Sequence, residues 1–163
     1  MRHVFFSFDW DDAWRAFQVR NSWVTKGNTA AGFVDSADVE KAKKQSPADV
    51  KKWIDDQLDR TSVTCVLIGA KTYKSKYVEY EIKKSIERKN GLLGIYIHQI
   101  LDSNRQMDSQ GENPFICPPF DFKHVEDSKM NYPCCTYYDW ITHKGFNNLD
   151  SWIESAYKQS HGT

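Results

Sequence analysis

Three short, almost uninterrupted apolar runs constrain the fold of this 163-residue chain more than any other feature. They lie at residues 4–8, 62–69 and 92–97, and the second is rich in β-branched residues. Runs of this kind are typical of central strands in a parallel sheet, because both faces of such strands are buried. We therefore expect three buried parallel strands, the first of which opens into a polar loop at Asp9.

Helical patterns separate these runs. A loose apolar pattern over residues 12–25 predicts a helix that Asp11 or Asp12 caps. Ser46-Pro47 predicts the start of another helix, with the serine hydroxyl as its cap and apolar residues at helical spacing as far as Leu58. The chain thus alternates between strand and helix from its first residues.

The remaining segments continue this alternation. We expect a short strand at residues 30–35, a helix over residues 78–86 that stops at Asn90-Gly91, a last strand at residues 137–141, and a last helix over residues 149–157 that Asn147-Asn148 cap. Residues 101–133 contain several prolines and predict a long irregular loop. The order of elements predicts a doubly wound α/β sheet in one domain over residues 1–163.

Composition and charge exclude several classes of function. Lys plus Arg and Asp plus Glu both number 22, so the formal net charge is zero and no long basic block offers a surface for nucleic acid. No segment approaches the length that crosses a membrane, and the apolar start of the chain is too brief for a signal peptide. The four cysteines lack the spacing of a secreted disulfide framework. We therefore expect a cytoplasmic protein that binds neither nucleic acid nor a membrane.

Side chains that can do chemistry gather where the first predicted strand ends. Ser7, Phe8, Asp9 and Trp10 could hold a ribose through a hydroxyl and a carboxylate and stack on a base. Neither the Gly-x-Gly-x-x-Gly fingerprint nor the Gly-x-x-x-x-Gly-Lys phosphate loop is present, so a nucleotide would have to be held in another way. The alternative is that Ser7 and Asp9 merely cap the following helix.

Glu81 lies in the helix that follows the strand at residues 62–69, near the crevice where open α/β sheets bind ligands. On a helical wheel Glu79 lies nearer the centre of the apolar stripe, and Glu81 lies on its other flank beside Tyr77. The helix dipole alone also favours an acid in the first turns. The residues by themselves therefore do not single out Glu81.

The cysteines and histidines predict no metal centre. Five of them can be grouped into a zinc site on paper: Cys117, His124, Cys134, Cys135 and His143. Their spacings match no zinc ribbon or finger. Cys65 lies in the middle of a strand, where a thiol usually fills apolar space. His98 ends the run at residues 92–97 and would either approach the crevice or bond to the backbone.

Several motifs resemble those of TIR domains. Phe5-Phe6-Ser7-Phe8 resembles their first box, and residues 64–81 resemble their third strand, loop and Trp-Cys-x-x-Glu helix, with Tyr77-Val78 in place of Trp-Cys. The TIR-like proteins of the bacterial Thoeris antiphage system are more closely similar, at residues 19–25, 62–69, 80–82 and 113–115. This resemblance extends over residues 3–120.

The resemblance implies a flavodoxin-like sheet of about five parallel strands and cleavage of NAD+ at the nicotinamide–ribose bond. It assigns the catalytic role to Glu81 and leaves Glu79 as a surface acid. Phe8 and Asp9 become ligand contacts, as does Ser7 from its place at the strand end, and Tyr77 becomes an aromatic wall of the site. NAD+ is then the substrate, with no cofactor and no metal. In the Thoeris branch, ADP-ribose becomes a cyclic or conjugated signal that a downstream effector reads.

The resemblance also implies self-association, because TIR enzymes commonly complete their site with a neighbouring subunit. The segment from Asp35 onward corresponds to the loop that gates the site and mediates assembly in TIR domains. The first strand end offers few cations for the NAD+ pyrophosphate. The candidates for that role are Arg15, Arg20 or Lys26 of the first helix, or basic residues of an adjoining protomer.

Two other functions stay open at this point. Many TIR domains are signalling adaptors without enzymatic activity, and the same crevice could bind a nucleotide as a receptor without turning it over. The acid at the position of the catalytic glutamate favours the enzyme.

Overall fold

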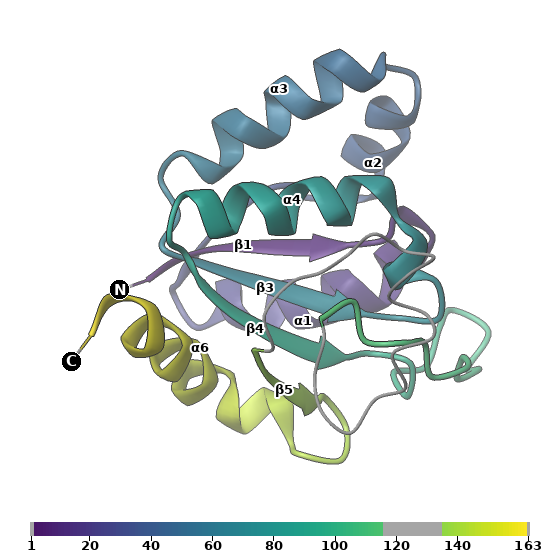
Figure 1. Cartoon of the computed structure of the whole chain (residues 1–163). Coiled ribbons are helices and arrows are strands. Elements are labelled where there is room, and N and C mark those ends of the chain that lie inside the picture. The colour runs from purple at the N-terminus through teal and green to yellow at the C-terminus, as the bar shows by residue number, and fades with distance from the viewer. Residues whose placement is uncertain (1, 116–134, 163) are drawn as a thin grey trace.

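The computed structural model describes residues 2–115 and 135–162 and has a central sheet of five parallel strands (Figure 1). The strands are β1 (His3–Phe8), β2 (Thr29–Ala31), β3 (Val63–Ile68), β4 (Gly91–Tyr96) and β5 (Thr136–Asp139). Their order across the sheet is β2-β1-β3-β4-β5, which is the flavodoxin-like order. The predicted doubly wound parallel sheet is confirmed.

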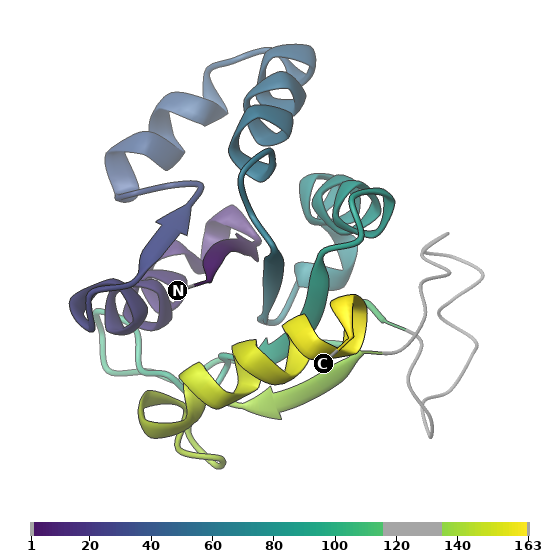
Figure 2. The same cartoon turned by 90° about the vertical axis from the view of Figure 1, so that its left-hand side faces the viewer.

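Helices cover both faces of the sheet (Figure 1, Figure 2). Helices α1 (Ala13–Thr25) and α6 (Gly145–His161) pack on one face, and α3 (Pro47–Leu58) and α4 (Lys76–Glu87) pack on the other. Helix α2 (Ser36–Lys43) follows β2 and contributes to the core on the α1 side. Within the described residues, no helix has the length and apolar character needed to cross a membrane.

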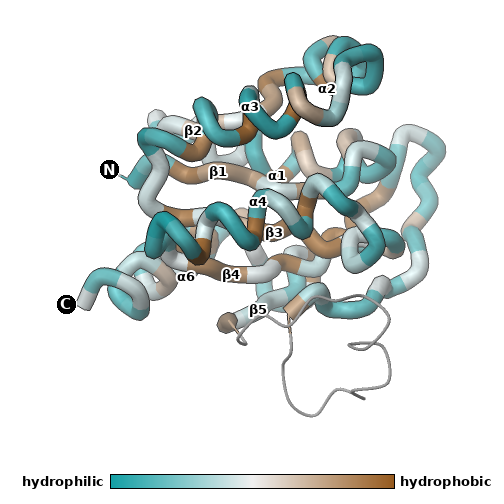
Figure 3. The backbone as a smooth tube through the Cα atoms, turned by 45° about the horizontal axis from the view of Figure 1, so that its top comes forward, coloured by the Kyte–Doolittle hydropathy of each residue, from teal (hydrophilic) through white to brown (hydrophobic). Residues whose placement is uncertain are grey.

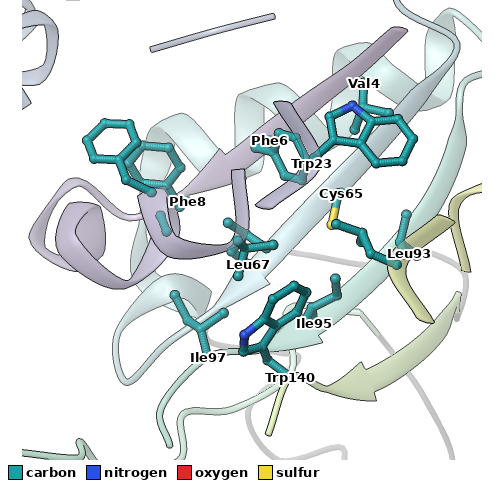
Figure 4. Close-up of a cluster of buried hydrophobic side chains, with 14 of the residues drawn as sticks. Val4, Phe6, Phe8, Trp23, Cys65, Leu67, Leu93, Ile95, Ile97 and Trp140 are labelled. Atoms are coloured by element: carbon teal, nitrogen blue, oxygen red, sulfur yellow. The ribbon is translucent and has the colours of Figure 1, made fainter. Parts of the chain in front are cut away.

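Alternating side chains along the strands build the core on both faces. Phe6, Phe8 and Leu67 point toward the α1 and α6 side, as Figure 4 shows, and Cys65 lies fully buried among them. Phe5 points to the other side, where it packs against α3. The hydrophobic residues accordingly concentrate along the central strands in Figure 3. Each large apolar side chain buried in this way contributes roughly 1.5–3 kcal/mol to the free energy of unfolding. The expectation that Cys65 fills apolar space is confirmed.

Two helix starts follow from serine caps. The Ser46 hydroxyl accepts a hydrogen bond from the Asp49 amide at 3.1 Å, and Pro47 occupies the first turn of α3, as the sequence predicts. The Ser75 hydroxyl does the same for the Val78 amide at 3.3 Å and begins α4. The start of α4 fixes where the side chains of its first two turns point.

The segment after β2 differs from the prediction. β2 ends at Ala31 rather than continuing to residue 35, because Gly32 adopts a φ of +95° that turns the chain. The residues from Asp35 onward, predicted as a loop, form α2. The Asp35 carboxylate caps this helix by accepting the Asp38 amide at 3.0 Å. An Asp three residues before another Asp was a helix-start signal that the predicted loop assignment overlooked.

The carboxyl-terminal elements are also displaced from their predicted bounds. β5 covers Thr136–Asp139 instead of residues 137–141, and α6 begins at Gly145 rather than at residue 149. Asn147-Asn148 therefore lie inside the helix and do not cap it. The Trp140 ring lies where a side chain on residue 145 would project, so only glycine fits there. Residues 101–115 contain no helix or strand, as predicted, and residues 116–134 lie outside the described part of the chain.

Candidate active site

The candidate site lies where the strand order reverses, at the carboxyl ends of β1 and β3. In flavodoxin-like sheets the crevice at this point is the usual place for a ligand. Ser7 lies near the end of β1 on the face that α3 and α4 cover, because its neighbours Phe6 and Phe8 point to the opposite face. The loop after β3 leads directly into α4, which carries Glu81.

A pair of hydroxyl groups sets the rotation of α4 on the sheet. The Ser85 and Thr64 hydroxyls lie 2.7 Å apart in a buried hydrogen bond, and the Ser85 hydroxyl also donates to the Glu81 carbonyl at 2.7 Å. This contact turns Val78, Glu81, Ile82 and Ser85 toward the sheet. Glu81 consequently points inward.

Burial dominates the electrostatics of Glu81. The residue is only 4% exposed, and loss of hydration raises the pKa of its carboxyl group well above the usual value. The nearby Ser7 hydroxyl acts in the opposite direction, although the pair does not meet the geometry of a full hydrogen bond. Among the described residues, no Lys or Arg offsets the loss of hydration. Burial therefore favours the protonated form of the Glu81 carboxyl group over the charged form.

The helical wheel gave the wrong buried face for α4. Glu79, which the wheel places nearer the apolar stripe, is half-buried, whereas Glu81 belongs to the buried face. The predicted apolar stripe includes Ile86, but in the third turn of α4 it is Ser85 that faces the sheet. A buried serine that bonds to a strand threonine is invisible to a hydrophobic pattern.

Asp9 caps a turn directly after the carboxyl end of β1. Its carboxylate accepts the Asp11 amide at 3.4 Å and so caps the 3-10 turn η1 (Trp10–Asp12), as the alternative interpretation proposed. Partial burial raises the pKa of Asp9, and Lys71 in the loop after β3 acts to lower it. Ser7 makes no such cap. Lys71 therefore acts on Asp9 through its charge, without an ion pair between the two among the described residues, and sequence reasoning missed Lys71.

An aromatic pair connects the start of η1 with the start of α4. The Trp10 and Tyr77 rings stack with centroids 4.9 Å apart and an interplanar angle of 17°. Tyr77 lies one helical turn before Glu81, on the same side of α4. The Phe8 ring lies in the core, edge-on to Phe17 and Phe33, so any contact between Phe8 and a ligand would come from its backbone. The Tyr77 ring thus lies within one turn of Glu81, whereas the Phe8 ring belongs to the core.

Arg15 holds the loop after β4 against the start of α1. Its side chain donates to the Ile100 carbonyl at 2.7 Å and to the Gln106 carbonyl at 2.9 Å. Three carboxylates lie within ion-pair distance of its guanidinium, those of Asp12, Asp102 and Asp108. Arg15 is buried and fully engaged, so it does not offer its charge to a pyrophosphate as the sequence suggested.

The other two candidates for the pyrophosphate also have different surroundings. Arg20 lies near the carboxylates of Asp35 and Asp38, and burial lowers its pKa. The Lys26 ammonium donates to the Phe146 carbonyl and lies over the Phe146 ring, against the start of α6. Neither contact lies at the carboxyl ends of β1 and β3.

Asp12 occupies the helix-cap position of α1 but makes no capping hydrogen bond. Its carboxylate lies against the backbone of Gly69, where a side chain would collide with it. Burial raises the pKa of Asp12 to about 6, the Asp9 carboxylate adds to this rise, and Arg15 opposes it. The ionised Asp12 carboxylate therefore lowers the free energy of unfolding near neutral pH.

We expect Asp12→Asn to stabilise the protein at pH 7. The folded protein binds the Asp12 proton more tightly than the unfolded chain, whose ordinary value is 3.8, so ionisation lowers stability as the pH rises through this window. The full cost is at most about 3 kcal/mol. Urea unfolding of both proteins at pH 5 and pH 7 measures the difference between their free energies of unfolding. The advantage of the variant should shrink by about 1 kcal/mol at pH 5, and an advantage that grows on acidification would contradict the assignment.

The structure describes only some of the histidines and cysteines that were considered as metal ligands. His98 is buried just beyond β4, and its Nδ1 atom has no hydrogen-bond partner among the described residues, so the expected bond from this atom to the backbone is absent. His143 Nδ1 accepts the Asp139 amide at 2.7 Å. Cys117, His124 and Cys134 lie outside the described residues. Within residues 2–115 and 135–162, no group of His, Cys, Asp and Glu could hold a metal ion.

Comparison with known proteins agrees with this geometry. Residues 5–102 match the family model of the Thoeris protein ThsB, TIR-like domain, a range that contains Ser7, Asp9, Tyr77 and Glu81. The chain belongs to this family. One relative is named "Putative cyclic ADP-D-ribose synthase ThsB1", from Bacillus cereus (strain MSX-D12). It is 34% identical to this chain over 189 aligned positions, which cover 93% of this chain and 98% of the relative.

A solved structure supports the fold of this ThsB-family chain. The TIR domain of the Toll-related receptor TRR-2 from Hydra magnipapillata superposes with a TM-score of 0.53 over 96% of this chain and 98% of that domain. The two sequences are only 12% identical, so this similarity concerns the fold alone. The resemblance to Thoeris TIR-like proteins that the motifs predicted is confirmed.

Proposed function

We propose that this protein cleaves NAD+ at the nicotinamide–ribose bond and converts the ADP-ribose into a cyclic or conjugated nucleotide signal in antiphage defence. The observation that carries this proposal is the near full-length similarity to a relative named as a cyclic ADP-D-ribose synthase. The buried carboxyl group at Glu81, beside the crevice of a flavodoxin-like sheet, supplies the group that such a reaction requires.

The reaction needs one carboxylate rather than two. When the bond between the ribose C1′ and the pyridinium nitrogen breaks, its electron pair moves to the nitrogen and nicotinamide leaves as a neutral molecule. No general acid is therefore required, unlike in ordinary glycoside hydrolysis. The ribosyl cation that remains is captured by a nucleophile of the same ADP-ribose or of a second molecule, which then loses a proton. Glu81 stabilises this cation through its charge and orients the ribose hydroxyls.

The raised pKa of Glu81 fits a group that ionises only when substrate is bound. Burial disfavours the charged form of this carboxyl group. The positively charged nicotinamide ribosyl group brings the opposite charge into the same low-dielectric space and lowers that pKa. The proton then leaves, and the carboxylate faces the bond that breaks.

The remaining contacts follow from the placement of the side chains. Ser7 lies beside the Glu81 carboxyl and would hold a ribose hydroxyl together with it. Asp9 follows β1 and Lys71 lies in the loop after β3, at the carboxyl ends of these strands, so Lys71 would meet the pyrophosphate. Tyr77, stacked on Trp10, would shield the nicotinamide ring from water. Phe8 contributes through its backbone.

Incubation of the purified protein with NAD+ tests the proposal, with released nicotinamide measured by chromatography. We expect nicotinamide in proportion to time and protein, with the same rate after treatment with EDTA, since neither a cofactor nor a metal takes part. A signalling adaptor would leave NAD+ unbound, and a receptor would bind it unchanged. Intact NAD+ after long incubation would therefore reject the enzyme.

Self-association is a further part of the proposal. The site of a TIR enzyme is commonly completed by a neighbouring subunit, and among the described residues Lys71 and Lys43 are cations whose charges interact with Asp9. We expect the initial rate per mole of protein to fall on dilution, in parallel with the particle mass from light scattering. A constant specific activity in a strictly monomeric sample would show that one chain holds the whole site. The nucleotide product, rather than a direct contact, would reach the downstream effector.

A further inference from the structure

A pocket of about 320 Å³ lies between α2, α3 and the turn after β2, and no residue assigned to the candidate active site lines it. Phe33 and Trp53 line it with stacked rings, their centroids 4.5 Å apart. Phe33 is buried and Trp53 is half-buried, so the indole is the ring that a ligand can reach. Gly32, with its φ of +95°, sets the turn that forms one edge of the pocket. A volume and an aromatic lining of this kind suit a small ligand with a flat ring.

The polar groups around this aromatic surface are few and partly pre-positioned. The Gln57 side-chain oxygen accepts the Gly32 amide at 3.0 Å, which leaves the Gln57 amide nitrogen as a donor. One Asp38 oxygen accepts the Val34 amide at 3.1 Å, and the other remains available as an acceptor. Gln45 adds a second carboxamide. Carboxamides and a carboxylate match the donors and acceptors of a nucleobase and its ribose.

A positively charged side chain, that of Lys41, lies at the rim of the pocket. Lys41 is exposed, lines the pocket, and makes no ion pair with any residue in the described part of the chain. Its ammonium group is therefore available to a phosphate, for which lysine is a common partner. A flat base against Trp53 and a phosphate on Lys41 together describe a nucleotide.

A series of ring contacts connects this pocket with the candidate active site. The Phe33 ring lies edge-on to Trp10, with centroids 5.9 Å apart, and Trp10 stacks on Tyr77, one turn before Glu81. Trp10 therefore contacts both Phe33, which lines the pocket, and Tyr77, which lies in the first turn of the helix that carries Glu81. A dinucleotide whose nicotinamide end lies at Glu81 has its adenosine monophosphate end on the far side of its pyrophosphate.

We infer that the pocket between α2 and α3 binds an adenine nucleotide, with the base against Trp53 and the phosphate on Lys41. This inference rests on the proposed function for its choice of base. Two sources share this chemistry: the adenosine monophosphate half of the NAD+ substrate, and a free nucleotide that binds beside it.

Calorimetric titration with AMP tests the site without any turnover. We expect AMP to bind the wild-type protein and Lys41→Met to weaken its affinity about tenfold, because the phosphate loses its charged partner. The matched control is Lys44→Met, an exposed lysine at the end of the same helix that does not line the pocket, which should change the affinity less than about twofold. Trp53→Leu, which removes the ring, should also weaken binding.

Competition with NAD+ then identifies the source of the nucleotide. If the pocket holds part of the substrate, AMP inhibits cleavage competitively and Lys41→Met raises KM while kcat stays unchanged. If it holds a free nucleotide, AMP binds equally well in the presence of saturating NAD+. Both results support the site. Failure of AMP to bind, or equal binding by wild type, Lys41→Met and Trp53→Leu, would overturn it even if NAD+ cleavage is observed. Binding of AMP without NAD+ cleavage would instead reject the enzyme and keep the site.

Discussion

We expect Glu81→Gln to reduce NAD+ cleavage by at least about 100-fold, because the change removes the only charge proposed to face the ribosyl cation. Glutamine has almost the same size as glutamate. Since burial disfavours the charge of the Glu81 carboxyl group, an uncharged amide at this position should leave the thermal midpoint nearly unchanged. The initial rate of nicotinamide release and the melting temperature, measured on the same preparation, separate loss of chemistry from loss of fold.

Glu79→Gln is the matched control for this substitution. Glu79 lies two residues away on the same helix but is only half-buried, and it does not belong to the face of α4 that contacts the sheet. The variant should cleave NAD+ at nearly the wild-type rate. A comparable loss in both variants, or a loss in Glu79→Gln alone, would move the catalytic role away from Glu81.

The second large effect concerns stability. Arg15→Met should lower the free energy of unfolding by about 3–5 kcal/mol at pH 7, because it leaves the buried Asp12 carboxylate without its partner. It also frees the carbonyls of Ile100 and Gln106, which hold the loop after β4. Chemical denaturation monitored by circular dichroism measures the change. The loop should become accessible to protease at lower denaturant concentration.

Arg88→Met provides the comparison for Arg15→Met. Arg88 also bonds to a backbone carbonyl and a carboxylate, both of Asp59, but this pair is exposed. Its loss should cost less than about 1 kcal/mol. Combining Arg15→Met with Asp12→Asn should restore part of the stability, because the uncompensated charge is then absent. Equal losses of stability in the two arginine variants, or no recovery of stability in the double variant, would show that the unpaired Asp12 carboxylate does not cause the destabilisation.

The strands and the main helices could be predicted because local signals specify them. Uninterrupted apolar runs gave β1, β3 and β4 within a residue or two, and Ser46-Pro47 gave the start of α3. α6 could not be placed in the same way. Its start depends on the close approach of the Trp140 ring to Gly145, a contact that no periodic pattern reveals.

The candidate site was predictable by motif but not by physical pattern. The motif resemblance pointed to Glu81, whereas its burial depends on the hydrogen bond between Ser85 and Thr64, two residues on different elements. The stacking of Trp10 on Tyr77 and the bonds from Arg15 to the loop after β4 likewise join distant parts of the chain. Such contacts exist only after the sheet has assembled. Lys71 went unnoticed for the same reason, because its place near Asp9 depends on the pairing of β1 with β3.

The central claim is that Glu81 drives cleavage of NAD+ and that the ADP-ribose captures itself or another acceptor rather than water. Mass analysis of products formed from NAD+ in water enriched in the heavy oxygen isotope tests this most directly. We predict release of nicotinamide and a nucleotide product without heavy oxygen at the ribose carbon that held nicotinamide. A cyclic product would also be one water lighter than ADP-ribose. Intact NAD+, or ADP-ribose that carries heavy oxygen as the sole product, would contradict the claim.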